Sequence, residues 1–261
     1  MMRGKRVCAV LLTALLLLCA CAEKPDAEVY DALSGLYADV GAQTRAAIGF
    51  RMEASFRDPD TGEAGVLYYL DGETRYDTVS SVAWQRFTAT RLGATVNAEE
   101  FYENGVRTHL ENGQETLIQT EPDTLFGAFP YRFASLPAFA ELKSLKTEES
   151  GNGLLYVLLS STGQKQLIEE IWGLDLYALA GITVPDRERE AYGDVSYTFS
   201  VVDGKVRTLF VRLTVSLFEQ TGYTPGYTPK EEDGRLDLTI QTQITFREAG
   251  EAVEIPAYGA A

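Results

Sequence analysis

The chain has 261 residues, with 23 Lys and Arg against 38 Asp and Glu, so its formal net charge at pH 7 is −15. This acidity argues against a nucleic-acid-binding protein, because such a protein needs a basic face to neutralise phosphates. Hydrophobic residues make up 45% of the chain and aromatic residues 11%, which excludes disorder as a description of the whole protein. The length allows one large β-rich domain or two small ones.

The N-terminal segment has the composition of an export signal. Arg3, Lys5 and Arg6 come before an apolar stretch, Val7–Leu18, that is too short for a transmembrane span of about 20 residues. The stretch leads into Leu18-Cys19-Ala20-Cys21, which resembles the bacterial lipobox, the signal for lipid attachment to a cysteine.

This resemblance implies that residues 1–20 are a lipoprotein signal peptide, that Cys21 is lipidated with palmitate-type acyl chains, and that residues 21–26 form a short tether. The alternative is a plain secretory signal with incidental cysteines. Ala22 stands where an inner-membrane retention signal would have Asp. We therefore expect an extracytoplasmic protein that is lipid-anchored to the cell membrane, and to the outer membrane if the cell has two.

The three cysteines of the chain, Cys8, Cys19 and Cys21, all lie in or at the end of this leader. The folded part therefore has no means of forming a disulfide or a thiolate metal site. The acyl anchor makes the membrane the one partner that the sequence predicts directly.

After the tether the hydrophobic pattern predicts one helix and then a run of strands. Apolar residues recur at helical spacing over 27–43, with Asp26 available as the N-cap. From Ile48 to Phe56 they alternate with polar residues, which is typical of a strand with one buried face. A returning strand is expected from residue 64, with Asp71-Gly72 as its end.

The rest of the chain continues this pattern, with a Pro-rich interruption. Asn104-Gly105 is a strong hairpin signal. The middle of the chain, 121–150, is expected to hold short helices and apolar loops, and a helix is expected at 163–173. Further strands are expected at about 74–90, 92–103, 106–110, 153–161, 192–202, 205–219 and 235–247.

The order of these elements resembles that of the LolA/LolB-like and LprG/LppX-like lipoprotein carriers. The closing stretch, from Phe246 to Pro256, is similar to the end of such domains, where a Val-x-Ile-Pro strand follows a glycine. The resemblance implies an α+β fold over residues 27–256, with a tail at 257–261. The fold would be a strongly curved antiparallel sheet, an unclosed half-barrel, with helices covering its concave face around a cavity for acyl chains.

Patterns for catalysis, metals and cofactors are missing. His109, the single histidine, follows the Asn104-Gly105 turn and is expected to be an exposed strand residue. No Gly-x-Ser-x-Gly or Ser-x-x-Lys occurs, and Asp58-x-Asp60-x-Gly62 departs from a calcium loop at its later positions, so it indicates a turn. A pair of carboxylates is not excluded. Acidic pairs such as Glu99-Glu100 are, however, expected on a solvated surface. We expect no enzyme activity, no metal and no cofactor.

Two functions from different classes remain. In the first, the half-barrel binds a lipid or another apolar ligand without catalysis. In the second, the protein is an interaction or structural module of the cell envelope with a packed, ligand-free interior and an unidentified protein partner. For the first function, face alternation gives Phe50, Met52, Phe56, Val66, Tyr68, Ile240 and Ile244 as the ligand-binding residues, with Phe126 and Phe129 in a covering segment.

Overall fold

The computed structural model describes residues 25–58, 61–91, 93–119, 136–151, 153–171, 173–220 and 234–259. The first element is the helix α2 (Ala27–Gly41), which the sequence predicted and which ends two residues earlier than expected. The Asp26 carboxylate caps it by accepting hydrogen bonds from the amides of Glu28 and Val29.

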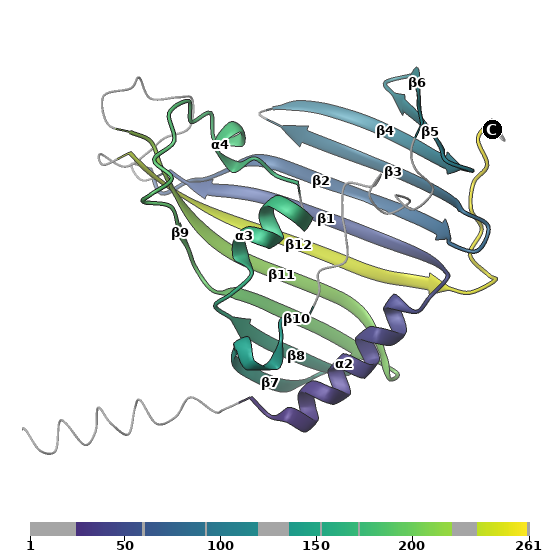
Figure 1. Ribbon diagram of the computed structural model, residues 1–261, viewed down its shortest axis with the longest axis horizontal. Coiled ribbons are helices and arrows are strands. Elements are labelled where there is room, and N and C mark those ends of the chain that lie inside the picture. The colour runs from purple at the N-terminus through teal and green to yellow at the C-terminus, as the bar shows by residue number, and fades with distance from the viewer. Residues whose placement is uncertain are drawn as a thin grey trace, which may run out of the picture.

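All the strands belong to one antiparallel sheet (Figure 1). Its order is β6-β5-β4-β3-β2-β1-β12-β11-β10-β8-β7, and the short β9 pairs with β11 to one side. Among the described residues neither end strand, β6 or β7, pairs with a further strand, so the sheet is not closed. The strands are β1 (Arg45–Arg57), β2 (Ala64–Asp77), β3 (Val82–Arg91), β4 (Ala94–Glu103), β5 (Val106–Glu111), β6 (Gln114–Gln119), β7 (Leu142–Ser150), β8 (Gly153–Ser160), β9 (Ala191–Tyr192), β10 (Val195–Val202), β11 (Lys205–Phe218) and β12 (Arg235–Ala249).

The hairpin turns follow the local sequence. Asn104-Gly105 joins β4 to β5 with φ values of 51° and 81°, and Asp203-Gly204 joins β10 to β11 with 51° and 68°. Positive φ at both central residues is the geometry of a tight hairpin turn, which Asn-Gly and Asp-Gly favour. The hairpin predicted at Asn104-Gly105 is confirmed, and Asp203-Gly204 joins the two strands expected at 192–202 and 205–219. A third turn of this kind, Asn112-Gly113, adds strand β6, which was not predicted.

Several predicted boundaries are wrong. Asp71-Gly72 does not end a strand, because β2 continues through it to Asp77. Gly72 is needed there for close packing: a Cβ atom would lie 2.6 Å from Cζ of Phe50 and 2.5 Å from the carbonyl oxygen of Arg86. The strand expected over 74–90 is divided between β2 and β3 by a turn.

The middle of the chain also differs from expectation. Strand β7 lies within the segment expected to hold only loops and short helices. It lacks the alternation that predicts a strand, because it is an end strand of the sheet and its last five residues are all exposed. The helix expected at 163–173 is a short α-helix, α3 (Gln164–Gln166), followed by a π-helical turn, η4 (Leu167–Ile171). Two more short elements are η3 (Phe139–Glu141) and α4 (Leu176–Leu179).

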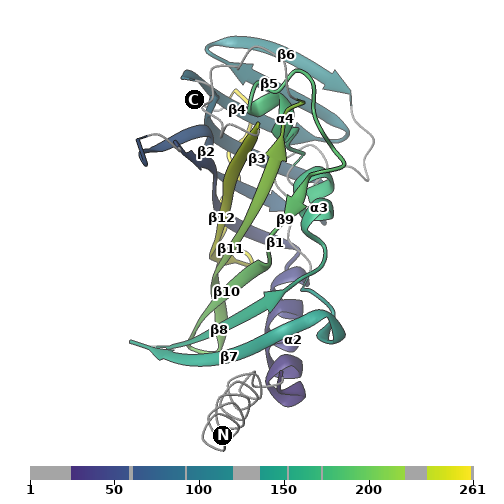
Figure 2. The ribbon, with the colours of Figure 1, turned by 90° about the vertical axis from the view of Figure 1, so that its left-hand side faces the viewer.

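The sheet curves around the side on which α2 and α3 lie (Figures 1 and 2), as the half-barrel expectation requires. Helix α2 crosses the ends of the central strands, with Leu33 fully buried. The Tyr37 ring of α2 lies 5.2 Å from the ring of Phe199 in β10 and 6.5 Å from that of Phe246 in β12. These contacts identify the face of Phe199 and Phe246 as the concave face. The α+β half-barrel with helices on this face is confirmed.

The C-terminal segment is irregular where a Val-x-Ile-Pro strand was expected. It is nevertheless held in place, because Val253 is fully buried and its carbonyl accepts a 2.9 Å hydrogen bond from Nε of Arg45. Tyr258 packs its ring at 5.4 Å from that of Phe101. Tertiary contacts rather than strand pairing fix this segment.

Candidate functional site

Four of the expected ligand-binding residues lie in the closely packed centre of the sheet. Phe50 and Met52 of β1 and Ile240 and Ile244 of β12 are each at most 3% exposed. Phe50 pairs directly with Ile244 across the two strands, and both belong to the main hydrophobic cluster. The structure thus brings these side chains together on the concave face.

The remaining expected residues are less uniform. Phe56 and Tyr68 are half-buried beside the same cluster. Val66 is 52% exposed, because the register between β1 and β2 shifts at this point: Ala54 pairs with Tyr68, but Ser55 pairs with Val66. Leu67 takes the buried place instead. The simple alternation expected around Val66 is therefore wrong. Phe126, Phe129 and Cys21 lie outside the described residues.

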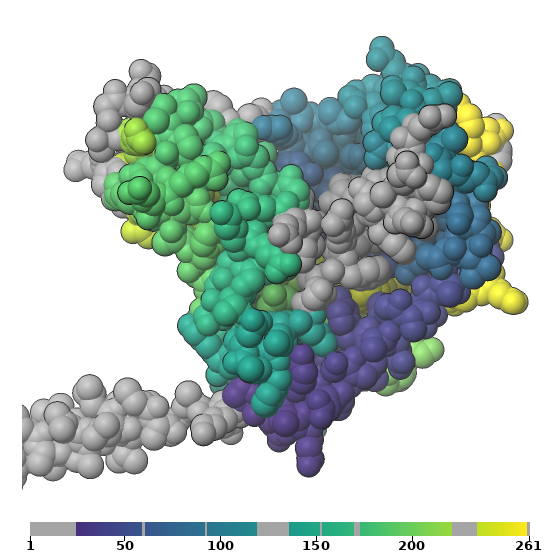
Figure 3. Space-filling view, in the orientation of Figure 1, coloured from purple at the N-terminus to yellow at the C-terminus, as the bar shows by residue number. Residues whose placement is uncertain are grey.

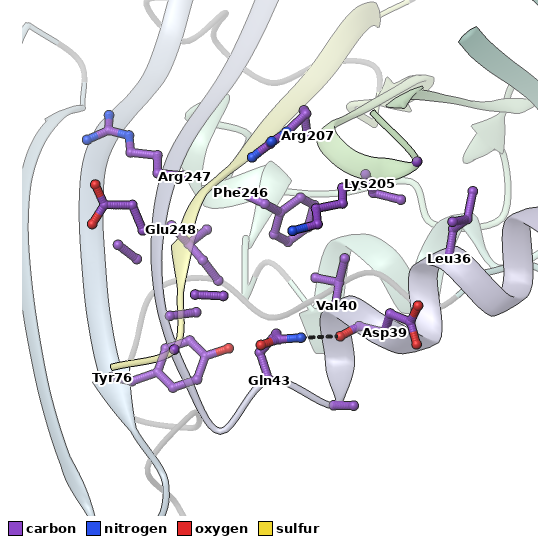
Figure 4. Close-up of a pocket in the computed structure, with 18 residues that line it drawn as sticks. Leu36, Asp39, Val40, Gln43, Tyr76, Lys205, Arg207, Phe246, Arg247 and Glu248 are labelled. Carbon is purple, nitrogen blue, oxygen red and sulfur yellow. Dashed lines mark hydrogen bonds between the residues drawn. The ribbon is translucent and has the colours of Figure 1, made fainter. Parts of the chain in front are cut away.

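A pocket of about 480 Å³ opens between the second half of α2 and the ends of β1, β11 and β12 (Figure 4). Its apolar walls come from Leu36, Val40, Ile48, Val206 and Phe246. Polar and apolar groups contribute about equally to its surface, because Gln43 and several charged side chains also line it. Its volume is within the range of small-ligand sites. None of the residues expected from alternation lines this pocket, although Ile48 and Phe246 are each two positions from one of them.

Charged groups surround the pocket. Lys205 and Arg207 stand at the start of β11, and Asp39 and Glu248 lie on the other elements of the rim (Figure 4). Among the described residues, no carboxylate lies within 4.0 Å of Lys205 or Arg207. Arg247, in contrast, is paired with Glu73. The two cations at β11 are therefore available to an anionic group of a ligand.

A row of polar side chains continues the pocket floor along the same face. Phe246 pairs with Ile48, and from Ile48 the cross-strand partners continue through β2, β3, β4 and β5. Directly paired residues point to the same side of a sheet. We call the resulting set the polar row; its members are Thr74, Gln85, Glu100 and His109.

The side chains of the polar row are more deeply buried than polar and charged residues usually are. Gln85 is fully buried, Glu100 is 5% exposed, and Thr74 is 2% exposed. His109 places Nδ1 2.8 Å from Oε1 of Glu100. The expectations of a solvated Glu100 and an exposed His109 are both wrong. A sequence signal for the burial of Glu100 existed. Ala98 and Tyr102 lie two positions before and after it in the same strand, and both are buried, so alternation places Glu100 on the buried face.

Within the described ranges, some side-chain atoms of the polar row have no hydrogen-bond partner. Thr74 Oγ1 donates to the carbonyl of Trp84 at 3.1 Å. Both polar side-chain atoms of Gln85 and Oε2 of Glu100 are buried without a partner among the described residues, as is Oγ1 of Thr242 in β12. A buried polar group left in this state costs about 1–3 kcal/mol, so such groups are rare in folded proteins. All four of these atoms lie on the concave face.

Two smaller pockets lie elsewhere. One of about 330 Å³ is next to α4, where the carboxylate of Glu190 accepts hydrogen bonds from the hydroxyls of Tyr177, at 2.7 Å, and Tyr192. Burial, and then the Glu190 carboxylate, raise the pKa of both tyrosines. Glu190 is fully engaged there. The other, of about 350 Å³, lies between β4 and the C-terminal segment.

Figure 3 shows the surface of the concave side. It is hollowed between the green residues around α4 and the teal residues of β4 and β5, with the blue strands β2 and β3 behind.

Within the described ranges, no group of three His, Cys, Asp or Glu side chains is arranged to hold a metal ion. Nor does that part of the chain hold a helix long and apolar enough to cross a membrane.

Comparison with known proteins gives a match in structure but none in sequence. No family model matches the chain, and no curated protein matches it in sequence. Among solved structures, the crystal structure of LprF from Mycobacterium bovis is similar over 90% of this chain and 99% of that one, with 9% sequence identity and a TM-score of 0.44.

Proposed function

We propose that the protein is a non-catalytic lipoprotein, anchored on the extracytoplasmic side of a membrane, that holds a lipid or another apolar ligand in its half-barrel. The observation that carries this proposal is the pocket under α2. Its volume of about 480 Å³ and the apolar side chains along part of its wall suit one acyl chain or a molecule of similar size.

The pocket leads toward the residues expected from the sequence. Ile48 and Phe246 line it, and Phe50 and Ile244 lie two positions further along the same strands and on the same face. A ligand that moves α2 slightly outward contacts these deeper side chains next. Phe50, Met52, Ile240 and Ile244 are thus the proposed second layer of the site, behind the pocket walls.

Native mass spectrometry tests ligand binding. The chain from Ala22 onward contains every described element, and we would purify it without detergent and extract whatever copurifies. We expect an apolar ligand in stoichiometric amount, and its loss in the variant Val40→Asp, which places a charge in the pocket wall. Val79→Asp is the matched control, because Val79 is 80% exposed in a turn. A mass without ligand, unchanged after incubation with envelope lipids, overturns the proposal.

The anchor has its own test. Supported by the lipobox-like sequence, Cys21 is the proposed site of acylation. Labelled palmitate should enter the wild-type protein, which should sediment with membranes. The Cys21→Ser variant should take up no label. Label that persists in Cys21→Ser would place the modification elsewhere.

A second function is favoured by one observation. The side chains at the centre of the concave face are nearly inaccessible, with Ile240 fully buried and Ile244 at 1% exposure. A filled interior suits an interaction or structural module of the envelope. This second function is supported if the purified protein stays free of ligand and also fails to bind a fluorescent fatty acid.

A further inference from the structure

The polar row is the feature of the concave face that apolar ligand binding does not use. We propose that it is a headgroup subsite for a primary ammonium with a neighbouring oxygen acceptor, carried by a single amphiphile whose apolar part lies in the pocket under α2. This inference rests on the proposed function and adds the chemical class of the ligand's polar end.

The position of the row relative to the pocket supports one ligand spanning both. Ile48 lines the pocket, and its partner Thr74 is the first member of the row. Neighbouring strands are about 4.8 Å apart, so Gln85 lies about 10 Å and Glu100 about 14 Å from Ile48 along the sheet. A phospholipid-type headgroup with one acyl chain has the length to bridge these distances.

The unpaired atoms define what the ligand must offer. Gln85 presents an acceptor, Oε1, and a donor, Nε2, and Glu100 presents a second acceptor, Oε2. The other carboxylate oxygen of Glu100 is engaged by His109. The missing partner therefore supplies at least two hydrogen-bond donors and one acceptor within reach of neighbouring strands.

Charge selects among the groups that meet this requirement. Hydrogen bonds from a cation to a carboxylate are about twice as strong as those between neutral groups. An ammonium can donate to both Oε2 of Glu100 and Oε1 of Gln85, and an adjacent phosphate or ester oxygen can accept from Nε2 of Gln85. A terminal carboxylate or phosphate would instead meet the Glu100 carboxylate. A diol supplies donors without the charge.

A matched pair of ligands tests the assignment. Lysophosphatidylethanolamine and lysophosphatidylglycerol with the same acyl chain share the phosphate and differ in ending in an ammonium or a diol. Binding is measured on the chain from Ala22 onward by displacement of a fluorescent fatty acid. We expect the ethanolamine lipid to bind about tenfold more tightly, which corresponds to about 1.4 kcal/mol.

Variants then test whether the polar row causes the preference for the ethanolamine lipid. Gln85→Leu and Glu100→Gln should each reduce the preference to about twofold or less while keeping the affinity for the fatty acid. Thr242→Val is the control, because it removes another buried unpaired oxygen on the same face but outside the row. It should leave the preference unchanged. Thermal unfolding checks folding, and Gln85→Leu is expected to be at least as stable as the wild type because it removes an unsatisfied amide.

The outcomes separate this inference from the proposed function. If the fatty acid and both lipids fail to bind, the proposed function itself is wrong. If they bind with equal affinity, or if the preference survives both variants, the polar row is not the subsite. If the protein prefers the glycerol lipid and the variants abolish that preference, the assignment of an ammonium group is wrong and the subsite binds a diol. Binding of free phosphoethanolamine as tightly as the lipid would overturn the link to the apolar pocket.

Discussion

The concave face has two halves that differ in what they bury. In the apolar half, one cross-strand row runs through Tyr156, Phe199, Leu209, Ile244 and Phe50, all of them buried. In the other half, on strands β2 to β5, the neighbouring row is polar, and some of its side-chain atoms have no hydrogen-bond partner in the part of the chain that the structure describes. The same sheet, covered from the same side, therefore combines a core that stabilises it with a row that reduces its stability.

This difference teaches how a half-barrel can be stable and still keep a place for a ligand. Apolar side chains on central strands contribute about 25 cal/mol for each Å² that they remove from water. The polar row contributes less, because its groups lose water without gaining full hydrogen bonding. This contrast predicts that substitutions in the two halves change the free energy of unfolding by different amounts, and in some cases in opposite directions.

The largest effect is expected in the apolar half. Phe199→Ala removes a ring that is 1% exposed and in contact with Tyr37, so the free energy of unfolding should fall by about 3–5 kcal/mol. Urea unfolding followed by circular dichroism measures this. Leu154→Ala, on β8 with 41% exposure, is the control and should cost less than about 1 kcal/mol. Equal losses would show that this half is not a packed core.

Alkaline pH should also reduce the stability of the apolar half. Burial, and then the nearby Glu141 carboxylate, raise the pKa of Tyr197 to about 12. Above the usual tyrosine pKa of about 10, this tyrosine ionises in the unfolded chain but stays neutral in the folded one. The free energy of unfolding is therefore unaffected by this group below pH 10. It falls by up to about 1.4 kcal/mol per pH unit between pH 10 and about pH 12.

Tyr197→Phe should make the free energy of unfolding less dependent on pH in this range. Tyr76→Phe offers the comparison on β2, where burial also raises the pKa. We expect it to flatten the profile less. Urea titrations on either side of pH 10 give the slopes, and an unchanged slope in Tyr197→Phe would contradict the assignment to this residue.

The boundary between the halves should be sensitive to added volume. At Gly72 the ring of Phe50 fills the place of a side chain, so Gly72→Ala should cost about 1–3 kcal/mol through displaced neighbours. A Cβ atom at Gly35 in α2 would meet no neighbouring atom within 4 Å. Gly35→Ala should therefore stabilise the protein by about 0.5–1 kcal/mol. Thermal unfolding of both variants checks the opposite signs.

The smallest effect is expected at the pocket rim. Lys205→Ala should weaken binding of a fatty acid by about two- to threefold, since an exposed charge contributes less than about 1 kcal/mol. The effect should diminish at high salt. Lys146→Ala, on the exposed side of edge strand β7, should change nothing. A larger loss in Lys146→Ala would place the anionic group away from this pocket.

Patterns that depend on neighbouring residues were sufficient for much of the fold. Alternation over 48–56 and 235–247 predicted β1, β12 and their buried faces, because successive side chains of a strand point to opposite sides. Asn104-Gly105 predicted its hairpin because these residues tolerate positive φ. The N-cap at Asp26 likewise predicted where α2 begins.

The candidate site was predicted less well. Glu100 and His109 were expected at the surface from their chemistry, whereas the register of β3, β4 and β5 places them on the covered face. The pocket under α2 is formed by segments as distant in sequence as Val40, Val206 and Phe246. No local pattern contains this information.

The sequence by itself determined most of the strands, the hairpin turn at Asn104-Gly105 and the acidic, cysteine-free body, because each depends on a residue and its immediate neighbours. Only the tertiary structure decided which residues share the concave face. The bulge that turns Val66 outward and the contact that requires Gly72 arise from pairing with β1, a different part of the chain. A shift of one residue in such pairing moves every following side chain to the other face, so the site is fixed by long-range register.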